Sequence, residues 1–139
     1  MPSMRVITGL LIVTFAVSVI HYTDNTINYA DYPSNGPVPD PGQTLVGLSW
    51  FLFTAFGLAG YLLLRRGRRQ AAAICLAVYS GSGLAGIAHY TIPGATDMVW
   101  WRQAHVISDI VCGIAVFALA MLLIRAPQPE DAASGEASR

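Results

Sequence analysis

Residues 44–64 read TLVGLSWFLFTAFGLAGYLLL and are followed at once by RRGRR, residues 65–69. The first stretch carries no charged side chain and is long enough to cross a bilayer as a helix, which takes about 20 apolar residues. The second is a block of arginines, and positive residues beside a span are typical of the cytoplasmic side of a membrane. Together the two stretches predict a membrane protein and indicate its orientation.

Further apolar windows lie on both sides of this one, and the predicted spans are residues 6–21, 44–64, 71–89 and 100–124. The chain of 139 residues is 54% hydrophobic and 12% charged, whereas a soluble domain carries about 25% charged residues. The sequence therefore predicts an all-α integral membrane protein, a four-transmembrane-helix bundle over residues 1–125. An outer loop is expected at 22–43, and a disordered cytoplasmic tail at 126–139, which is rich in Pro, Ala, Ser and acidic residues.

The charges divide between the two sides of this four-span arrangement. One side holds Arg5, Arg65, Arg66, Arg68, Arg69 and Arg125. The other holds Asp24, Asp31, Asp40 and Asp97, with Arg102 as its only arginine. Because arginines near span ends stay in the cytoplasm, we expect a multi-pass protein of the cell membrane with both termini in the cytoplasm.

The first span also allows a different interpretation. Arg5 precedes a short apolar stretch, and Ala16-Val17-Ser18 could serve as the small-residue site at which a signal peptide is cleaved. Cleavage would leave three spans, and the placement of the other arginines fits four better.

Two pairs of segments resemble each other along the chain. His21-Tyr22-Thr23 follows the first span as His89-Tyr90-Thr91 follows the third, and the second and fourth spans end in Leu62–Arg65 and Leu122–Arg125. These similarities are typical of a duplicated helical hairpin whose copies are related by an axis along the membrane normal.

The polar residues of the spans gather at one depth. His21 and His89 end their spans on the outer side, and a rise of ~1.5 Å per residue places His105 about 7 Å and Asp109 about 13 Å below the outer boundary. An unpaired carboxylate at the depth of Asp109 costs ~2.5 kcal/mol or more, so it must be protonated, paired with a His or Tyr side chain, or bound to an ion. The sequence thus predicts a pocket of His, Asp and Tyr side chains near the extracytoplasmic face.

Three hypotheses compete for this pocket. In the first, His21, His89, His105 and Asp109 bind a divalent metal such as zinc, iron or copper. The protein would then be a membrane enzyme acting on a lipid-like or isoprenoid-like substrate, with Asp109 or Asp24 as the general base. The spacing of His105 and Asp109, one helical turn apart, allows two ligands or a ligand with its hydrogen-bonding partner.

In the second hypothesis the polar side chains only hold the helices together, and the chain is a binding or accessory membrane protein. Its partners would be the lipid bilayer and either a lipid-like ligand or a larger membrane complex. In the third, the pocket holds haem between two histidines, or a quinone. The sequence leaves these alternatives open.

The layout is similar to that of sterol isomerases and sigma-2 receptors, in which acidic and histidine residues line a lipid-sized cavity. The similarity rests on His21, on Asp31-Tyr32-Pro33 and on the pair His105 and Asp109. That group carries acidic side chains on its second span, whereas this chain has none between Leu45 and Leu64. The departure puts membership in doubt, and none is assigned.

Several functional motifs are absent from the sequence. It contains no glycine-rich phosphate loop, HExxH, nucleophile elbow or CxxC, so nucleotide, peptide and ester chemistry lack support. The arginines at 65–69 lie beside two spans and are typical of a topology signal that also contacts anionic lipid. No nucleic-acid partner is expected.

Overall fold

The computed structural model describes residues 1–33 and 41–125. Its long helices are α1 Met4–Ile27, α2 Gln43–Arg65, α3 Arg69–Leu84 and α4 Trp100–Arg125, and α3 continues as a 3₁₀ helix, η2 Ala85–Thr91. All four are long and apolar enough to cross a membrane, and the described ranges contain no strand. The predicted all-α four-helix bundle is confirmed, and the chain is a multi-pass membrane protein. Residues 34–40 of the predicted outer loop and the predicted tail, 126–139, lie outside the described residues.

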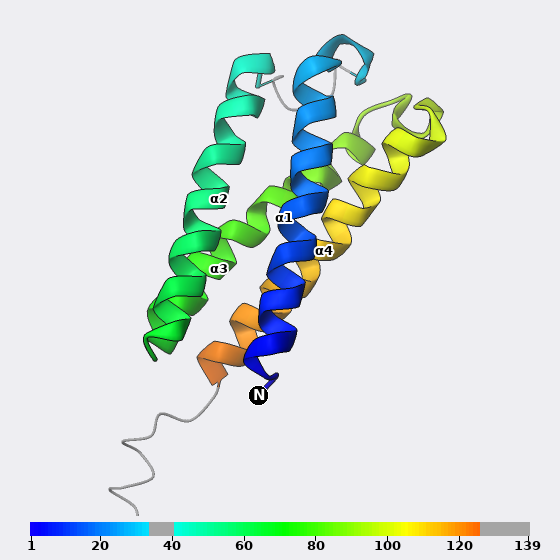
Figure 1. Cartoon of the computed structure of the whole chain (residues 1–139). Coiled ribbons are helices and arrows are strands. Elements are labelled where there is room, and N and C mark those ends of the chain that lie inside the picture. The colour runs from blue at the N-terminus through cyan, green and yellow to red at the C-terminus, as the bar shows by residue number, and fades with distance from the viewer. Residues whose placement is uncertain (34–40, 126–139) are drawn as a thin grey trace, which may run out of the picture.

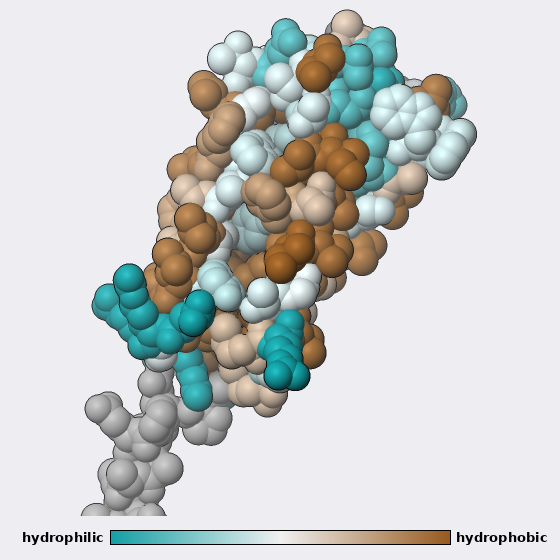
Figure 2. All heavy atoms as spheres, viewed as in Figure 1, coloured by the Kyte–Doolittle hydropathy of each residue, from teal (hydrophilic) through white to brown (hydrophobic). Residues whose placement is uncertain are grey.

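Each helix packs against its neighbour in the chain, and α4 packs back against α1 (Figure 1). α3 lies between α2 and α4 and is the most buried span. One end of the bundle carries the N-terminus, the loop 65–69 and Arg125, and we call it the arginine end (Figure 1). The opposite end, where η1 Tyr29–Asp31 follows α1 and α4 begins, is called the histidine end. Apolar side chains cover much of the surface between the two hydrophilic ends (Figure 2).

Two helix ends differ from the prediction. α1 continues to Ile27 instead of giving way to a loop near residue 22. Asp24 and Asn25, which favour turns in an isolated segment, are buried here and bonded to side chains of other elements, so the helix is not interrupted. The third span changes from α to 3₁₀ geometry at Ala85.

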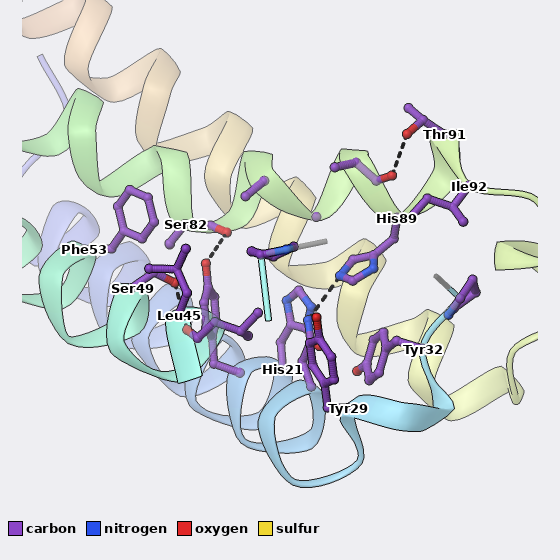
Figure 3. A pocket seen from close by; sticks show the side chains of 18 of the residues that line it. His21, Tyr29, Tyr32, Leu45, Ser49, Phe53, Ser82, His89, Thr91 and Ile92 are labelled. Carbon is purple, nitrogen blue, oxygen red and sulfur yellow. Dashed lines mark hydrogen bonds between the residues drawn. The ribbon is translucent and has the colours of Figure 1, made fainter. Parts of the chain in front are cut away.

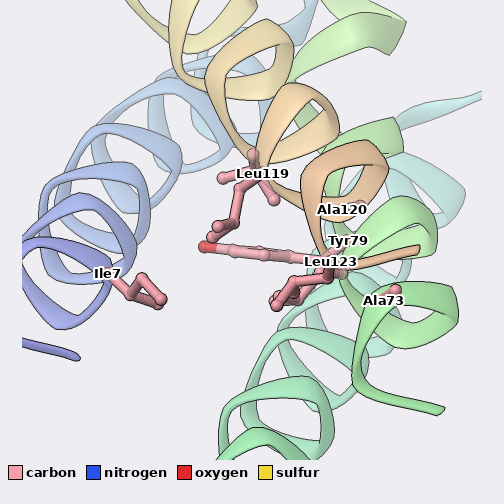
Figure 4. Close-up of a cluster of buried hydrophobic side chains, with 8 residues drawn as sticks. Ile7, Ala73, Tyr79, Leu119, Ala120 and Leu123 are labelled. Atoms are coloured by element: carbon pink, nitrogen blue, oxygen red, sulfur yellow. The ribbon is translucent and has the colours of Figure 1, made fainter. Parts of the chain in front are cut away.

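The apolar core lies nearer the arginine end. It comprises Ile7 of α1, Ala73, Leu76 and Tyr79 of α3, and Val116, Leu119, Ala120 and Leu123 of α4 (Figure 4). α2 contributes only partly buried side chains to this cluster, among them Phe53 and Phe56. The buried residues of α2 itself are two glycines, Gly57 and Gly60. The second span is therefore the least buried of the four.

Two glycines bring α3 and α4 into backbone contact. A Cβ atom at Gly83 would overlap the carbonyl oxygen of Asp109, and one at Gly113 would lie 2.9 Å from the backbone of Ser80 and Leu84. Close approach at small residues is a common way to pack membrane helices, because lipid gives no hydrophobic drive for helix association. This contact fixes α4 against α3 at the level of Asp109.

Candidate functional site

Asp109 is fully buried and pairs with a histidine from another helix. Its side chain is 0% exposed, and its Oδ2 lies 2.7 Å from Nδ1 of His21 on α1. The spacing along α4 allows His105, one turn away, as a partner, and the structure shows no hydrogen bond between these two side chains among its described residues. The partner is different because Asp109 faces α1, which the spacing along α4 does not reveal.

Asp24 is the acceptor at the centre of a second group, the Asp24 network of Asp24, Asn28, Tyr32 and Arg102. Arg102 Nε donates to Asp24 Oδ2 at 2.9 Å, and the Tyr32 hydroxyl donates to the same oxygen at 2.6 Å. Asn28 Nδ2 donates to Oδ1 at 2.6 Å. Burial, followed by the bond to Asp24, raises the pKa of the Tyr32 phenol, so its hydroxyl stays protonated and donates. The network ties α4 to the end of α1 and to the segment that follows it.

Arg102 has further contacts that hold it in place. Its Nη2 lies 3.1 Å from Asp31 Oδ2, and its guanidinium lies over the rings of Tyr32 and Trp101, 5.0 and 5.1 Å from their centroids. His105 Nε2 is 3.3 Å from Asp24 Oδ2, in a geometry that falls short of a hydrogen bond. The one arginine of the acid-rich side thus acts as the counterion of Asp24.

The three histidines converge, as the sequence predicts. The ring centroid of His21 lies 5.8 Å from that of His89 and 5.5 Å from that of His105. Asn25 Nδ2 donates to His89 Nε2 at 3.2 Å, and the ring of Tyr32 lies 5.1 Å from that of His89. Each histidine therefore directs one ring nitrogen at a different partner, on Asp109, Asn25 or Asp24.

The different directions of the three histidine nitrogens are evidence on the metal hypothesis. Residues 1–33 and 41–125 contain no group of three or more His, Cys, Asp or Glu side chains that could hold a metal ion. The predicted site of His21, His89, His105 and Asp109 is therefore not supported, because the rings meet without aiming their nitrogens at one point. The catalytic roles of Asp109 and Asp24 stay predictions.

A cavity of about 560 Å³ lies at the histidine end, between α1, α2 and η2 (Figure 3). Its polar lining includes His21, Tyr22, Asn25 and His89. Its apolar lining includes Leu45, Val46, Phe53, Ala85 and Ile92. Of the predicted site residues, only His21 and His89 line it, while Asp24, His105 and Asp109 lie behind them.

His21, which lines this cavity, has one ring nitrogen without a hydrogen-bond partner among the described residues. Its Nδ1 is bonded to Asp109, and its buried Nε2 has no hydrogen-bond partner among the described residues. Gly86 of η2 also lines the cavity, and a Cβ atom there would lie 3.6 Å from His21 Cε1. The backbone of this glycine therefore lies close to the edge of the imidazole and to Ile110.

A second cavity of about 490 Å³ lies along the same two helices. It is lined mainly by apolar groups of α1 and α2, with Tyr79 of α3. Between the cavities Trp50 bridges the helices, since its Nε1 donates to Ser18 Oγ at 3.2 Å and its ring lies 5.8 Å from that of Phe15. Both cavities therefore have walls formed by α1 and α2.

Sequence reasoning missed Arg102 as a member of the site. A lone arginine among aspartates on the outer side was the available signal, because a charge in that position needs a counterion.

Comparisons with protein-family models, with curated proteins and with solved structures found no match. The site is therefore interpreted from its own geometry.

Proposed function

We propose that this protein is a membrane-embedded binding protein that holds a lipid-like molecule in the cavity at the histidine end. The observation that carries the proposal is the combination of mostly apolar walls with one buried, unpartnered imidazole nitrogen, His21 Nε2. An unsatisfied buried polar atom costs free energy, and a ligand that bonded to it would recover that cost.

The shape of the cavity supports an amphipathic ligand. Its volume of about 560 Å³ lies within the range of small-molecule sites, roughly 300–1,000 Å³. The apolar body of the ligand would lie against Leu45, Val46 and Phe53, and its polar head would face His21 and His89. Few polar groups at one end of an apolar cavity are typical of sites that orient such molecules.

The α1–α2 interface offers access from the bilayer. α2 buries two glycines and exposes Leu48, Phe51 and Leu52, so it is the span with the fewest buried residues. Residues of both α1 and α2 line each of the two cavities. A molecule dissolved in the membrane would reach the site by separating α1 from α2, with α3 and α4 unchanged.

The Asp24 network has a supporting role in this proposal. It fixes Tyr32, whose ring lies against His89 at the wall of the cavity. It also holds the segment after α1, from which Tyr29, Ala30 and Pro33 line the same cavity. Asp24 thus positions binding residues and leaves the ligand contacts to others.

The orientation of the molecule is part of the proposal. Arg5, the arginines of 65–69 and Arg125 all lie at the arginine end. The positive-inside rule then places this end and both termini in the cytoplasm of a cell-membrane protein, with the cavity on the extracytoplasmic side.

Two exposed positions test the orientation. In a variant with Cys75→Ala and Cys112→Ala, we expect Thr96→Cys to react with an impermeant thiol reagent in intact cells. Arg66→Cys should react only after the cells are permeabilised. The opposite pattern of labelling would reverse the orientation.

Photo-crosslinking tests the binding site itself. An uncharged long-chain methyl ketone carrying a diazirine in its chain is added to the purified protein in lipid nanodiscs, and the crosslinked residues are mapped by mass spectrometry. We expect labelling at the cavity walls, near Leu45, Phe53 and Ile92. Excess unlabelled ketone should compete with it.

The chain offers a matched pair of control variants. Ser49 lines the cavity and Ser108 is exposed on α4, and each donates its hydroxyl to a backbone carbonyl one turn earlier. Ser49→Trp fills the cavity and should abolish the mapped labelling, whereas Ser108→Trp should leave it unchanged. Labelling spread evenly over the lipid-facing surface, and equal in both variants, would refute the proposed site.

A further inference from the structure

The charge balance around Asp109 determines what His21 can offer a ligand. Asp109 is 0% exposed, and His21 is the one basic side chain in contact with it among the described residues. Arg102 is engaged by Asp24 and Asp31 instead. A lone negative charge buried at this depth is costly, so the pair of His21 and Asp109 is expected to be neutral overall.

Because the pair of His21 and Asp109 is neutral overall, the position of the hydrogen atoms on the His21 ring can be inferred. A neutral pair with Asp109 protonated on Oδ1 would bury that hydrogen without an acceptor, because Oδ1 has no partner among the described residues. The pair is therefore an imidazolium with a carboxylate, or a neutral imidazole that accepts a proton from the carboxylic acid. In both arrangements the shared hydrogen lies between Nδ1 and Oδ2, and Nε2 carries a hydrogen of its own. His21 Nε2 is therefore a buried donor without an acceptor among the described residues, on a residue that lines the cavity.

His89 adds a second donor. An amide nitrogen can only donate, so the bond from Asn25 Nδ2 makes His89 Nε2 the acceptor. In a neutral imidazole the hydrogen then lies on Nδ1. His89 also lines the cavity, so the cavity is lined by two imidazoles that each carry an N–H group with no partner assigned to it among the described residues.

The lining lacks charges that would recognise an ionic head. Among the described residues that line the cavity there is no Asp, Glu, Lys or Arg. A carboxylate or phosphate head would be desolvated there without a formal positive side chain, and an ammonium head without a negative one.

We propose that the ligand is an uncharged lipid with a carbonyl head group, a ketone, quinone or ester, whose oxygen accepts hydrogen bonds from His21 Nε2 and His89 Nδ1. This inference rests on the proposed binding function and names the class of molecule bound. A carbonyl oxygen has two lone pairs and no hydrogen, so it matches two donors. An alcohol would bring a hydroxyl hydrogen that finds no acceptor in either imidazole, and it should bind about three- to tenfold more weakly.

Infrared difference spectroscopy tests the assignment. The probe is a long-chain methyl ketone labelled with ¹³C at the carbonyl, added to the protein in nanodiscs and to empty nanodiscs. Bound probe should show a carbonyl band at lower frequency than probe in lipid, because hydrogen bonding weakens the C=O bond. The band should be absent from the double variant His21→Phe with Asp109→Leu.

The double variant is designed to fold. Replacing only His21 would leave the buried carboxyl of Asp109 unpaired, whereas replacing both partners with apolar groups of similar size can be nearly neutral. In addition, His21→Gln retains an N–H group at this position and should restore part of the shifted band. Photo-crosslinking of the ketone should weaken about three- to tenfold in the double variant.

The outcomes separate this inference from the function on which it rests. A ketone that crosslinks in the cavity without a shifted carbonyl band would overturn the inference and leave the binding site intact. Stronger competition by the matched alcohol or fatty acid than by the ketone would also overturn it. If none of the three probes occupies the cavity, the proposed function itself fails.

Discussion

The two helical hairpins of this bundle are packed in different ways. α3 and α4 meet at Gly83 and Gly113, where a side chain on either residue would collide with the backbone of the other helix. α1 and α2 meet through the bulky Trp50 and Phe15, with a cavity on each side of that contact. Small residues therefore allow backbone contact between α3 and α4, whereas bulky aromatic residues keep α1 and α2 far enough apart for cavities to lie between them.

Because of this difference, the residues that stabilise the fold and the residues that would bind a ligand lie in different parts of the bundle. The apolar core is built mainly by α3 and α4, with Ile7 of α1. The cavity and its free imidazole nitrogen lie on the opposite side, where α2 has little buried surface. A bundle of this kind can bind and release a ligand at one interface without loosening the other.

The largest effect is expected from Gly83→Ala. The new Cβ atom would overlap the carbonyl of Asp109, and backbone cannot move aside as a side chain can. We expect a loss of about 3 kcal/mol or more in the free energy of unfolding, measured by denaturant titration in mixed micelles. Gly9→Ala is the matched control, because nothing lies within 4 Å of its new Cβ atom, and it should stabilise α1 by up to about 1 kcal/mol. If the two variants unfold alike, the α3–α4 interface is not as close as described.

A smaller loss is expected from Asp24→Ala. It removes the acceptor of Arg102, Tyr32 and Asn28 and leaves Arg102 buried with only Asp31 as counterion. Breaking a buried ion pair costs about 3–5 kcal/mol, and we expect about 2–3 kcal/mol because Asp31 remains. Asp31→Ala, at a side chain that is 62% exposed, should cost ~0–1 kcal/mol. Equal losses in thermal melts of the two variants would show that Asp24 is not the centre of the network.

The smallest effect concerns the contact between the cavities. Trp50→Phe keeps an aromatic ring against Phe15 and removes the donor to Ser18. We expect a cost of about 0.6 kcal/mol, the average for hydrogen bonds between membrane helices. Trp100→Phe, at a residue that is 79% exposed, should cost nothing measurable. A loss from Trp50→Phe as large as that from Gly83→Ala would remove the contrast between the two interfaces.

The sequence was sufficient to predict what depends on local composition. The four apolar windows became the four helices. The convergence of the histidines followed from their common depth. The proposed duplication of the hairpin stays a prediction.

Features that depend on tertiary contacts were not predictable in the same way. The spacing of His105 and Asp109 allowed a pair on one helix. Asp109 bonds to His21 instead, because α4 packs against Gly83 with its Asp109 side chain turned toward α1. The composition after His21 favoured a loop, but α1 continues because Asp24 and Asn25 find partners elsewhere. The metal hypothesis is not supported for a similar reason, since residue types and depth do not reveal where ring nitrogens point.

Native mass spectrometry of the protein released from nanodiscs tests most directly whether the cavity at the histidine end holds a lipid. The nanodiscs contain phospholipid and a long-chain methyl ketone, and wild type is compared with Ser49→Trp and Ser108→Trp. The account predicts a ketone adduct on wild type and on Ser108→Trp that is lost from Ser49→Trp, because only that tryptophan fills the cavity. Equal adducts on all three proteins, or no ketone adduct on wild type, would contradict it.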